Sequence, residues 1–197
     1  MIRDFPLELI DFICDKLSVK ILSNILNENS NVFNILNKKR IEKYWVKNGT
    51  SKLAEIGDLQ GIKYLHENGA DIIAKNNYAI EWASRNGHLK VVKYLHKNGV
   101  DITANDNHAI KLASVYGHLD VVKYLHENGA DITADNNYAI TWASENGHLE
   151  VVKYLHENGA DIIAKNNYAI EWASRNGHLK VVKYLHENGA DITAEIN

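Results

Sequence analysis

Histidine is the side chain of this sequence best suited to chemistry, because a neutral imidazole can ligate a metal ion or exchange a proton near neutral pH. Nine of the ten histidines recur at intervals of 30 residues, in two positions of one pattern. Equivalent side chains on helices stacked roughly 8–10 Å apart cannot share one ion with bonds of about 2 Å. The spacing therefore predicts no metal site, and the first of the two sets is expected to bond backbone groups at a turn. The sets are His88, His118, His148 and His178, and then His66, His96, His126, His156 and His186.

Nothing else in the sequence favours catalysis. Cys14, the only cysteine, lies on an apolar helical stripe with no histidine near it in the sequence. There is no nucleophile–base pair, metal signature or glycine-rich phosphate loop. We therefore predict a protein that is not an enzyme and uses no cofactor. A single cysteine also excludes an internal disulfide and suits a reducing compartment.

Charge and hydropathy narrow the choice of partner and compartment. The chain has 197 residues, a formal net charge of −3 and a pI near 6.4. It therefore lacks the basic surface that nucleic acid or an anionic membrane requires. No basic-then-apolar leader opens the chain, and no apolar run is long enough to span a bilayer. We expect a cytoplasmic or nuclear protein with a protein partner.

The recurring histidines belong to a unit of two short helices and a loop. In residues 77–104 an alanine-rich helix ends at Gly87, and a second helix ends at Asn98 and Gly99, where positive φ is needed. Asn77 is expected to cap the first helix through its side chain. A unit this small cannot bury its own apolar face, so it is stable only when stacked on copies of itself. First helices are predicted near 50–56, 77–86, 107–116, 137–146 and 167–176, and second helices near 59–67, 89–97, 119–127, 149–157 and 179–187.

Residues 87–104 resemble the second helix and loop of an ankyrin repeat, and the resemblance covers residues 48–197. It implies an all-α solenoid of about five stacked helix pairs. Ankyrin repeats usually have about 33 residues, whereas the repeat here has 30, and the missing residues come from the loop tip. Projecting fingers should therefore be trimmed, which shifts the expected binding to the first helices. The repeat is rich in Asn, Ile and Lys and resembles the ankyrin arrays of giant DNA viruses of amoebae, which would place the protein in the host cytosol.

The sequence predicts a non-enzymatic protein–protein interaction module that binds its partner on the concave first-helix face. Val115 and Tyr116 are the expected anchors, because an aromatic and an aliphatic side chain amid charges are typical of a binding hot spot. The alternative is that these positions are only exposed to solvent and vary in sequence without contacting a partner. Trp82, Trp142 and Trp172 are expected to pack between repeats. The predicted contact residues are Glu81, Arg85, Lys111, Val115, Tyr116, Thr141, Glu145, Glu171 and Arg175.

Residues 1–47 lack the repeat and carry apolar stripes typical of three short helices. One interpretation is a cap that covers the first repeat. The other is that residues 5–17 resemble the opening of an F-box, the segment that docks on the adaptor of cullin ubiquitin ligases. The chain would then be the substrate-recognition subunit of such a ligase. Carried over from that family, the adaptor-binding residues would be Pro6, Leu7, Leu9, Ile10 and Ile13.

Two properties of the whole array are also expected. No polar closing repeat covers the outer apolar flank of the last helix pair, which favours weak end-to-end self-association. Half-buried imidazoles in the position of His96 prefer to be neutral, so the array should lose stability in mild acid.

Overall fold

The computed structural model describes residues 38–73 and 77–191. Within these residues the chain forms ten helices and no strand, so the predicted all-α fold is confirmed. The helices are α4 (Lys38–Ile56), α5 (Leu59–Glu67), α6 (Tyr78–Arg85), α7 (Leu89–Lys97), α8 (Ala104–Val115), α9 (Leu119–Glu127), α10 (Ala134–Glu145), α11 (Leu149–Glu157), α12 (Ala164–Arg175) and α13 (Leu179–Glu187).

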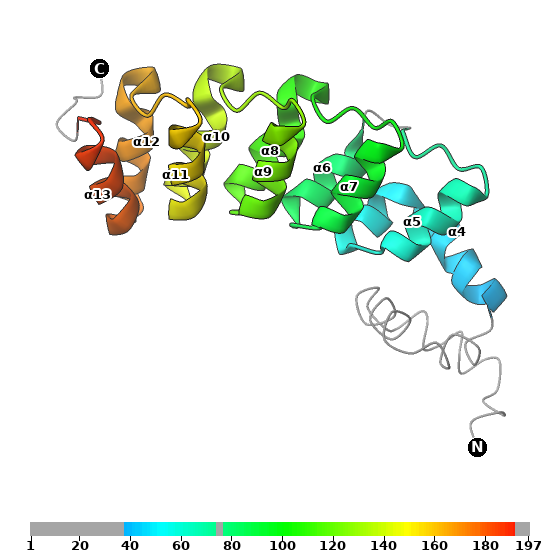
Figure 1. Cartoon of the computed structure of the whole chain (residues 1–197). Helices are drawn as coiled ribbons and strands as arrows, with labels where there is room; N and C mark the ends of the chain where they lie inside the picture. The colour runs from blue at the N-terminus through cyan, green and yellow to red at the C-terminus, as the bar shows by residue number, and fades with distance from the viewer. Residues whose placement is uncertain (1–37, 74–76, 192–197) are drawn as a thin grey trace.

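The helices form five pairs that stack in one row (Figure 1). In each pair an even-numbered helix, the first helix, packs against the odd-numbered helix that follows it. Neighbouring pairs meet mainly through their first helices, because α4, α6, α8, α10 and α12 contact one another in sequence far more closely than the second helices do. Small alanines on the first helices permit this close approach: Ala79, Ala109, Ala139 and Ala169 are all buried.

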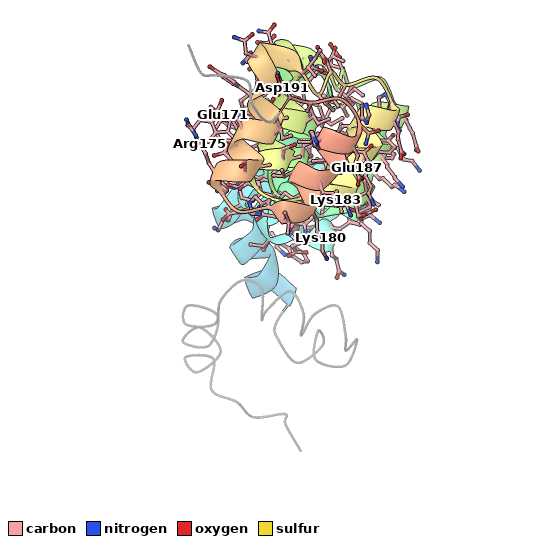
Figure 2. The ribbon with its side chains drawn as sticks, turned by 90° about the vertical axis from the view of Figure 1, so that its left-hand side faces the viewer. Glu171, Arg175, Lys180, Lys183, Glu187 and Asp191 are labelled. Carbon is pink, nitrogen blue, oxygen red and sulfur yellow. The ribbon has the colours of Figure 1, made fainter. Side chains whose placement is uncertain are left out.

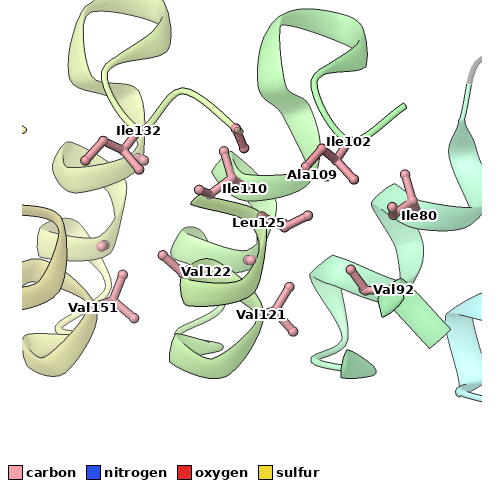
Figure 3. Packing of buried hydrophobic residues seen from close by; sticks show 14 of the residues in the cluster. Ile80, Val92, Ile102, Ala109, Ile110, Val121, Val122, Leu125, Ile132 and Val151 are labelled. Carbon is pink, nitrogen blue, oxygen red and sulfur yellow. The ribbon is translucent and has the colours of Figure 1, made fainter. Parts of the chain in front are cut away.

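The core runs without interruption through the stack. Two adjacent valines recur on α7, α9, α11 and α13, and those of α9 serve two different interfaces. In Figure 3, Val121 points toward Val92 of the preceding pair and Val122 points toward Val151 of the following pair. Both valines of α9 are fully buried, and so is Leu125 between them and the first helix. The apolar stripe at helical spacing that the sequence predicts is thus the stripe that is buried.

Where one repeat meets the next, a glycine of the first repeat contacts a histidine ring of the second. Gly87 has a φ of +73°, and a Cβ at this position would lie 2.6 Å from Nδ1 of His118 in the next repeat. The Nε2–H of His118 donates to the carbonyl of Arg85 at 2.9 Å. The predicted bonding of this histidine set to the backbone is confirmed for three members, since His88 and His148 make the same bond to Glu55 and Val115.

Three first helices open with a left-handed turn that the sequence analysis did not anticipate. Asn105, Asp106 and Asn107 have φ values of 52°, 54° and 62°, and residues 135–137 and 165–167 repeat this conformation. Asn and Asp enter this region more readily than other residues with a Cβ. Helices α8, α10 and α12 therefore begin at residues 104, 134 and 164, earlier than predicted. The predicted cap is also wrong, because Asn77 has a φ of 64° and makes no side-chain cap bond.

Helix α4 joins the first repeat to the residues before it. Gly49 (φ 70°, ψ 172°) interrupts its helical geometry. Trp45 is buried, and its indole Nε1 donates to Oδ2 of Asp58 at 2.9 Å. A Cβ on Gly61 would lie 2.6 Å from the Trp45 ring, so this indole belongs to the core of the first repeat although it precedes residue 48. The F-box-like residues Pro6, Leu7, Leu9, Ile10 and Ile13 lie outside the described residues.

Candidate functional site

The two helix rows give the array two faces. In the end view of Figure 2, Glu171 and Arg175 of α12 lie on one side, and Lys180, Lys183 and Glu187 of α13 lie on the other. We call these the first-helix face and the second-helix face. All nine predicted contact residues belong to the first helices α6, α8, α10 and α12, with Tyr116 as the residue that ends α8.

Three of the nine predicted contact residues are buried, so their expected exposure is wrong. Glu81, Lys111 and Thr141 are only 6%, 8% and 7% exposed, and they occupy the same position on α6, α8 and α10. The left-handed turn of the following repeat provides polar partners for the first two of these side chains. Burial of a charged side chain is tolerated only with such partners.

The partners differ from one joint to the next. One carboxylate oxygen of Glu81 accepts from Asn105 Nδ2 at 2.6 Å, and the other lies 3.2 Å from Nδ1 of His108. Lys111 Nζ lies 3.6 Å from the carboxylate of Asp135. These side chains hold neighbouring repeats together, and they are not free to contact a partner.

A second row of predicted residues, one helical turn further on, remains accessible. The guanidinium of Arg85 lies 5.0 Å from the ring centroid of Trp82 and 4.8 Å from that of Tyr116. Such distances are those of a cation–π contact. Tyr116 is 42% exposed although one of its faces is covered by Arg85. Val115 is half-buried, and its carbonyl accepts the bond from His148.

On α12 the residue in this row is Arg175, and its contacts are with residues of its own helix. The guanidinium of Arg175 lies 5.0 Å from the ring centroid of Trp172, and its Nη2 lies 3.0 Å from the carboxylate of Glu171. Arg175 is exposed, whereas the side chain of Glu171 is largely covered. Both residues were predicted to contact a partner, and the structure brings them together on one helix.

The ring contacts that the structure shows for the tryptophans of α6, α10 and α12 lie within their own helices. Trp82 and Trp172 are each covered by an arginine of their own helix. Trp142 stacks on Tyr138, again on its own helix, with ring centroids 5.1 Å apart and an interplanar angle of 29°. The sequence signal for this pair is the spacing of two aromatic residues at i and i+4, which places them on the same side of a helix.

Trp142 and Tyr138 were not among the predicted contact residues, yet they form the most open aromatic surface of α10. Trp142 is 37% exposed. Burial raises the pKa of Tyr138, and the carboxylates of Asp135 and Glu145 raise it further. The negative charge of Glu145 therefore acts on this aromatic pair.

The second-helix face uses its aromatic residues differently. The hydroxyl of Tyr94 is hydrogen-bonded to Nδ1 of His66 at 2.9 Å, and the two rings meet edge to face. Tyr124, Tyr154 and Tyr184 repeat this bond with His96, His126 and His156. Lysines of the preceding repeat cover three of the tyrosine rings at 5.2–5.7 Å from the centroid. We call this row the His–Tyr ladder; its half-buried histidines confirm the predicted burial of the His96 position.

Stacked helix pairs with a continuous core and one open face define a helical repeat protein. The family model described as ankyrin repeats (3 copies) matches residues 51–136 and 110–196, and the chain belongs to this family. No curated protein matches the chain. In the described part of the chain, no three His, Cys, Asp or Glu residues are grouped as metal ligands require. Among the same residues, no helix is long and apolar enough to cross a membrane.

Proposed function

We propose that this chain is a non-enzymatic interaction module that binds a protein partner on its first-helix face. Ankyrin repeats are protein-interaction modules, and repeat arrays of this kind present extended binding surfaces. The observation that supports the choice of face is the placement of the exposed aromatic residues. In the described residues, all four of them lie on first helices or at their ends: Tyr78, Tyr116, Trp142 and Tyr168.

Exposed aromatic side chains favour recognition because they contribute large contact areas to interface hot spots. The tyrosines of α7, α9, α11 and α13 are unsuited to this role, since the His–Tyr ladder already engages their hydroxyls. Of the nine predicted contact residues, the proposal keeps the six that are not fully buried. These are Arg85, Val115, Tyr116, Glu145, Glu171 and Arg175.

Selection of binders from a phage-displayed peptide library against the full chain tests the choice of face. Peptides selected on the native array should lose binding to the double variant Tyr116→Ala, Trp142→Ala. They should keep binding to Lys90→Ala, Lys180→Ala, which changes two exposed residues of the second-helix face. Selected peptides that respond only to the lysine variant would show that the second-helix face is the binding surface.

A second role as a ligase subunit is supported by the spacing of residues 5–17, which is similar to the opening of an F-box. The adaptor would bind Pro6, Leu7, Leu9, Ile10 and Ile13, and the array would carry the substrate. Calorimetric titration of the adaptor into the full chain tests this role, with Leu9→Asp, Ile10→Asp as the control. Micromolar binding that the folded control lacks supports the ligase role, and its absence favours the cap.

The shortened repeat further supports a relationship to the ankyrin arrays of giant amoebal viruses, and with it a place in the host cytosol. Expression of the chain with a fluorescent tag in amoebae tests this location. A tagged chain that collects on membranes would contradict it.

A further inference from the structure

Three first helices carry the same pair of positions, a tryptophan and the residue three places after it. On α6 the pair is Trp82 and Arg85, and on α12 it is Trp172 and Arg175. On α10 the tryptophan is kept as Trp142, but the arginine is replaced by Glu145. The array thus contains two filled copies and one altered copy of a single arrangement.

In the filled copies the guanidinium of the helix itself occupies the tryptophan face. Arg85 and Arg175 both lie 5.0 Å from the centroid of their own indole. The remaining contacts of each guanidinium are also made within the array, to the ring of Tyr116 for Arg85 and to the carboxylate of Glu171 for Arg175. These two tryptophans are therefore less available to a cation from outside.

In the altered copy, Glu145 occupies the sequence position of the two arginines, so a carboxylate replaces the guanidinium. Trp142 is 37% exposed and is supported by the Tyr138 ring stacked against it. Glu145 has no ion-pair partner among the residues that the structure describes. It is close enough to raise the pKa of Tyr138, so its charge acts beside the aromatic pair.

Lys111 and Arg175, two cations of the first-helix face, already have partners of their own. Lys111 lies over the Tyr138 ring, 5.4 Å from its centroid, and 3.6 Å from Asp135. Arg175 is paired with Glu171 and stacked on Trp172. An open indole next to an unpaired carboxylate is complementary to a cation with a flat apolar face, and guanidinium combines stacking with bidentate bonding to carboxylate.

Accordingly, we propose that Trp142 and Glu145 form a binding site for an arginine side chain of the partner. The partner guanidinium stacks on the indole of Trp142 and bonds to the carboxylate of Glu145, in the place that Arg85 and Arg175 fill on their own helices. The inference rests on the proposed function, because it names the chemistry that one site of the first-helix face recognises. It predicts that the partner presents a basic segment to α10.

NMR of the full chain labelled at the tryptophan indoles tests the site directly. The probes are acetyl-Gly-Arg-Gly-amide and its neutral match acetyl-Gly-Gln-Gly-amide, and Trp142→Phe identifies the Trp142 signal. The arginine peptide should shift the Trp142 indole signal saturably at millimolar concentration, while the glutamine peptide leaves it in place. Glu145→Gln should weaken binding of the arginine peptide about twofold to fivefold, which is the size of an exposed ion pair, because the indole of Trp142 remains.

Glu145→Arg is the decisive variant, because it gives α10 the residue that α6 and α12 already carry and should fold as they do. It should remove the response of Trp142 to the arginine peptide. An unchanged response in Glu145→Arg, or no saturable shift in the native chain, overturns the site. A lysine peptide that binds as tightly as the arginine peptide overturns the preference for guanidinium. If this site fails while the selected peptides still depend on Tyr116 and Trp142, the proposed function stands without it.

Discussion

The first-helix face and the second-helix face both carry a regular supply of aromatic side chains, but the two faces use them in different ways. On the second-helix face, tyrosines such as Tyr124 bond to a histidine of the preceding repeat and lie under its lysine. On the first-helix face, Tyr116 and Trp142 keep more than a third of their surface exposed. The second-helix face therefore uses its tyrosines for contacts between repeats, whereas the first-helix face leaves aromatic surface exposed.

The difference between the faces also explains where the repeats vary. A step of the His–Tyr ladder needs a histidine in one repeat and a tyrosine in the next, so a change in either copy breaks a bond in both. The Val-Val-Lys-Tyr-Leu-His stretch is accordingly kept in α7, α9, α11 and α13. On the first helices the packing does not fix the side chain that follows the recurring serine, and this position is occupied by Arg85, Val115, Glu145 and Arg175.

The sharpest test of this comparison replaces one tyrosine on each face. Tyr124→Ala should lower the free energy of unfolding by about 2–4 kcal/mol, because it removes a half-buried ring, the bond to His96 and the ring beneath Lys93. Tyr116→Ala should lower it by less than about 1 kcal/mol, since only the contact with Arg85 is lost. Urea unfolding of both variants measures the difference. Equal losses would contradict the division of roles.

A smaller effect should separate the buried and the open positions within the first-helix face. Glu81→Ala leaves Asn105 and His108 without their shared acceptor and should cost about 1–2 kcal/mol of stability. Glu145→Ala, on the next turn of an equivalent helix, should change stability by less than about 0.5 kcal/mol. Chemical denaturation of the two alanine variants compares them. A larger loss for Glu145→Ala would place this residue among the structural contacts.

The stability of the array should depend on pH through His148, which lies in the turn between α10 and α11. Burial lowers the pKa of His148 from 6.5, and the neighbouring His118 and His178 lower it further, although the bond to Val115 opposes this. Below about pH 6.5 the unfolded chain therefore binds this proton more readily, and stability that is complete above that pH is lost as the pH falls. Melting temperatures near neutral pH and near pH 5 should differ less in His148→Asn than in the native chain. The same pH dependence in both proteins would count against the role of His148.

The smallest expected effect concerns the apolar surface of α13, on the outer flank of the last described pair. Leu179 is 77% exposed, whereas its equivalent Leu149 is half-buried, and Val182 is more exposed than Val152. The predicted end-to-end pairing would involve this apolar surface, and Leu179→Asp should weaken it. Light scattering over a range of concentrations measures the effect. A mass that stays monomeric for the native chain at every concentration would rule the pairing out.

The second helices show how much of this fold the sequence specifies. Their predicted limits agree with α5, α7, α9, α11 and α13 as observed, because a glycine at each end and a stripe of Val and Leu define them locally. The early start of α8 was missed, since a run of three left-handed residues has no periodic signal.

The candidate site could be predicted only in part. The sequence located the variable first helices, but it placed Glu81 and Lys111 on the surface. The partners that cover them, Asn105 and Asp135, lie 24 residues further along the chain, as the 24-residue separation of the Asn105–Glu81 bond shows. A local pattern cannot indicate such contacts, because they exist only once the next repeat has folded over the helix.

The contact between the glycine of one repeat and the histidine of the next has a consequence for how repeats can be duplicated or lost. Gly87 receives His118, and Gly117 receives His148 in the same way. If recombination removed residues 88–117, Gly87 would be followed directly by His118 and would receive His148 instead, with the same bond to the carbonyl of residue 85. Loss or gain of whole units therefore preserves the glycine–histidine contact at every joint, whereas loss of part of a unit breaks one. Whole copies can therefore be exchanged within the gene, and the number of helix pairs then changes in whole steps.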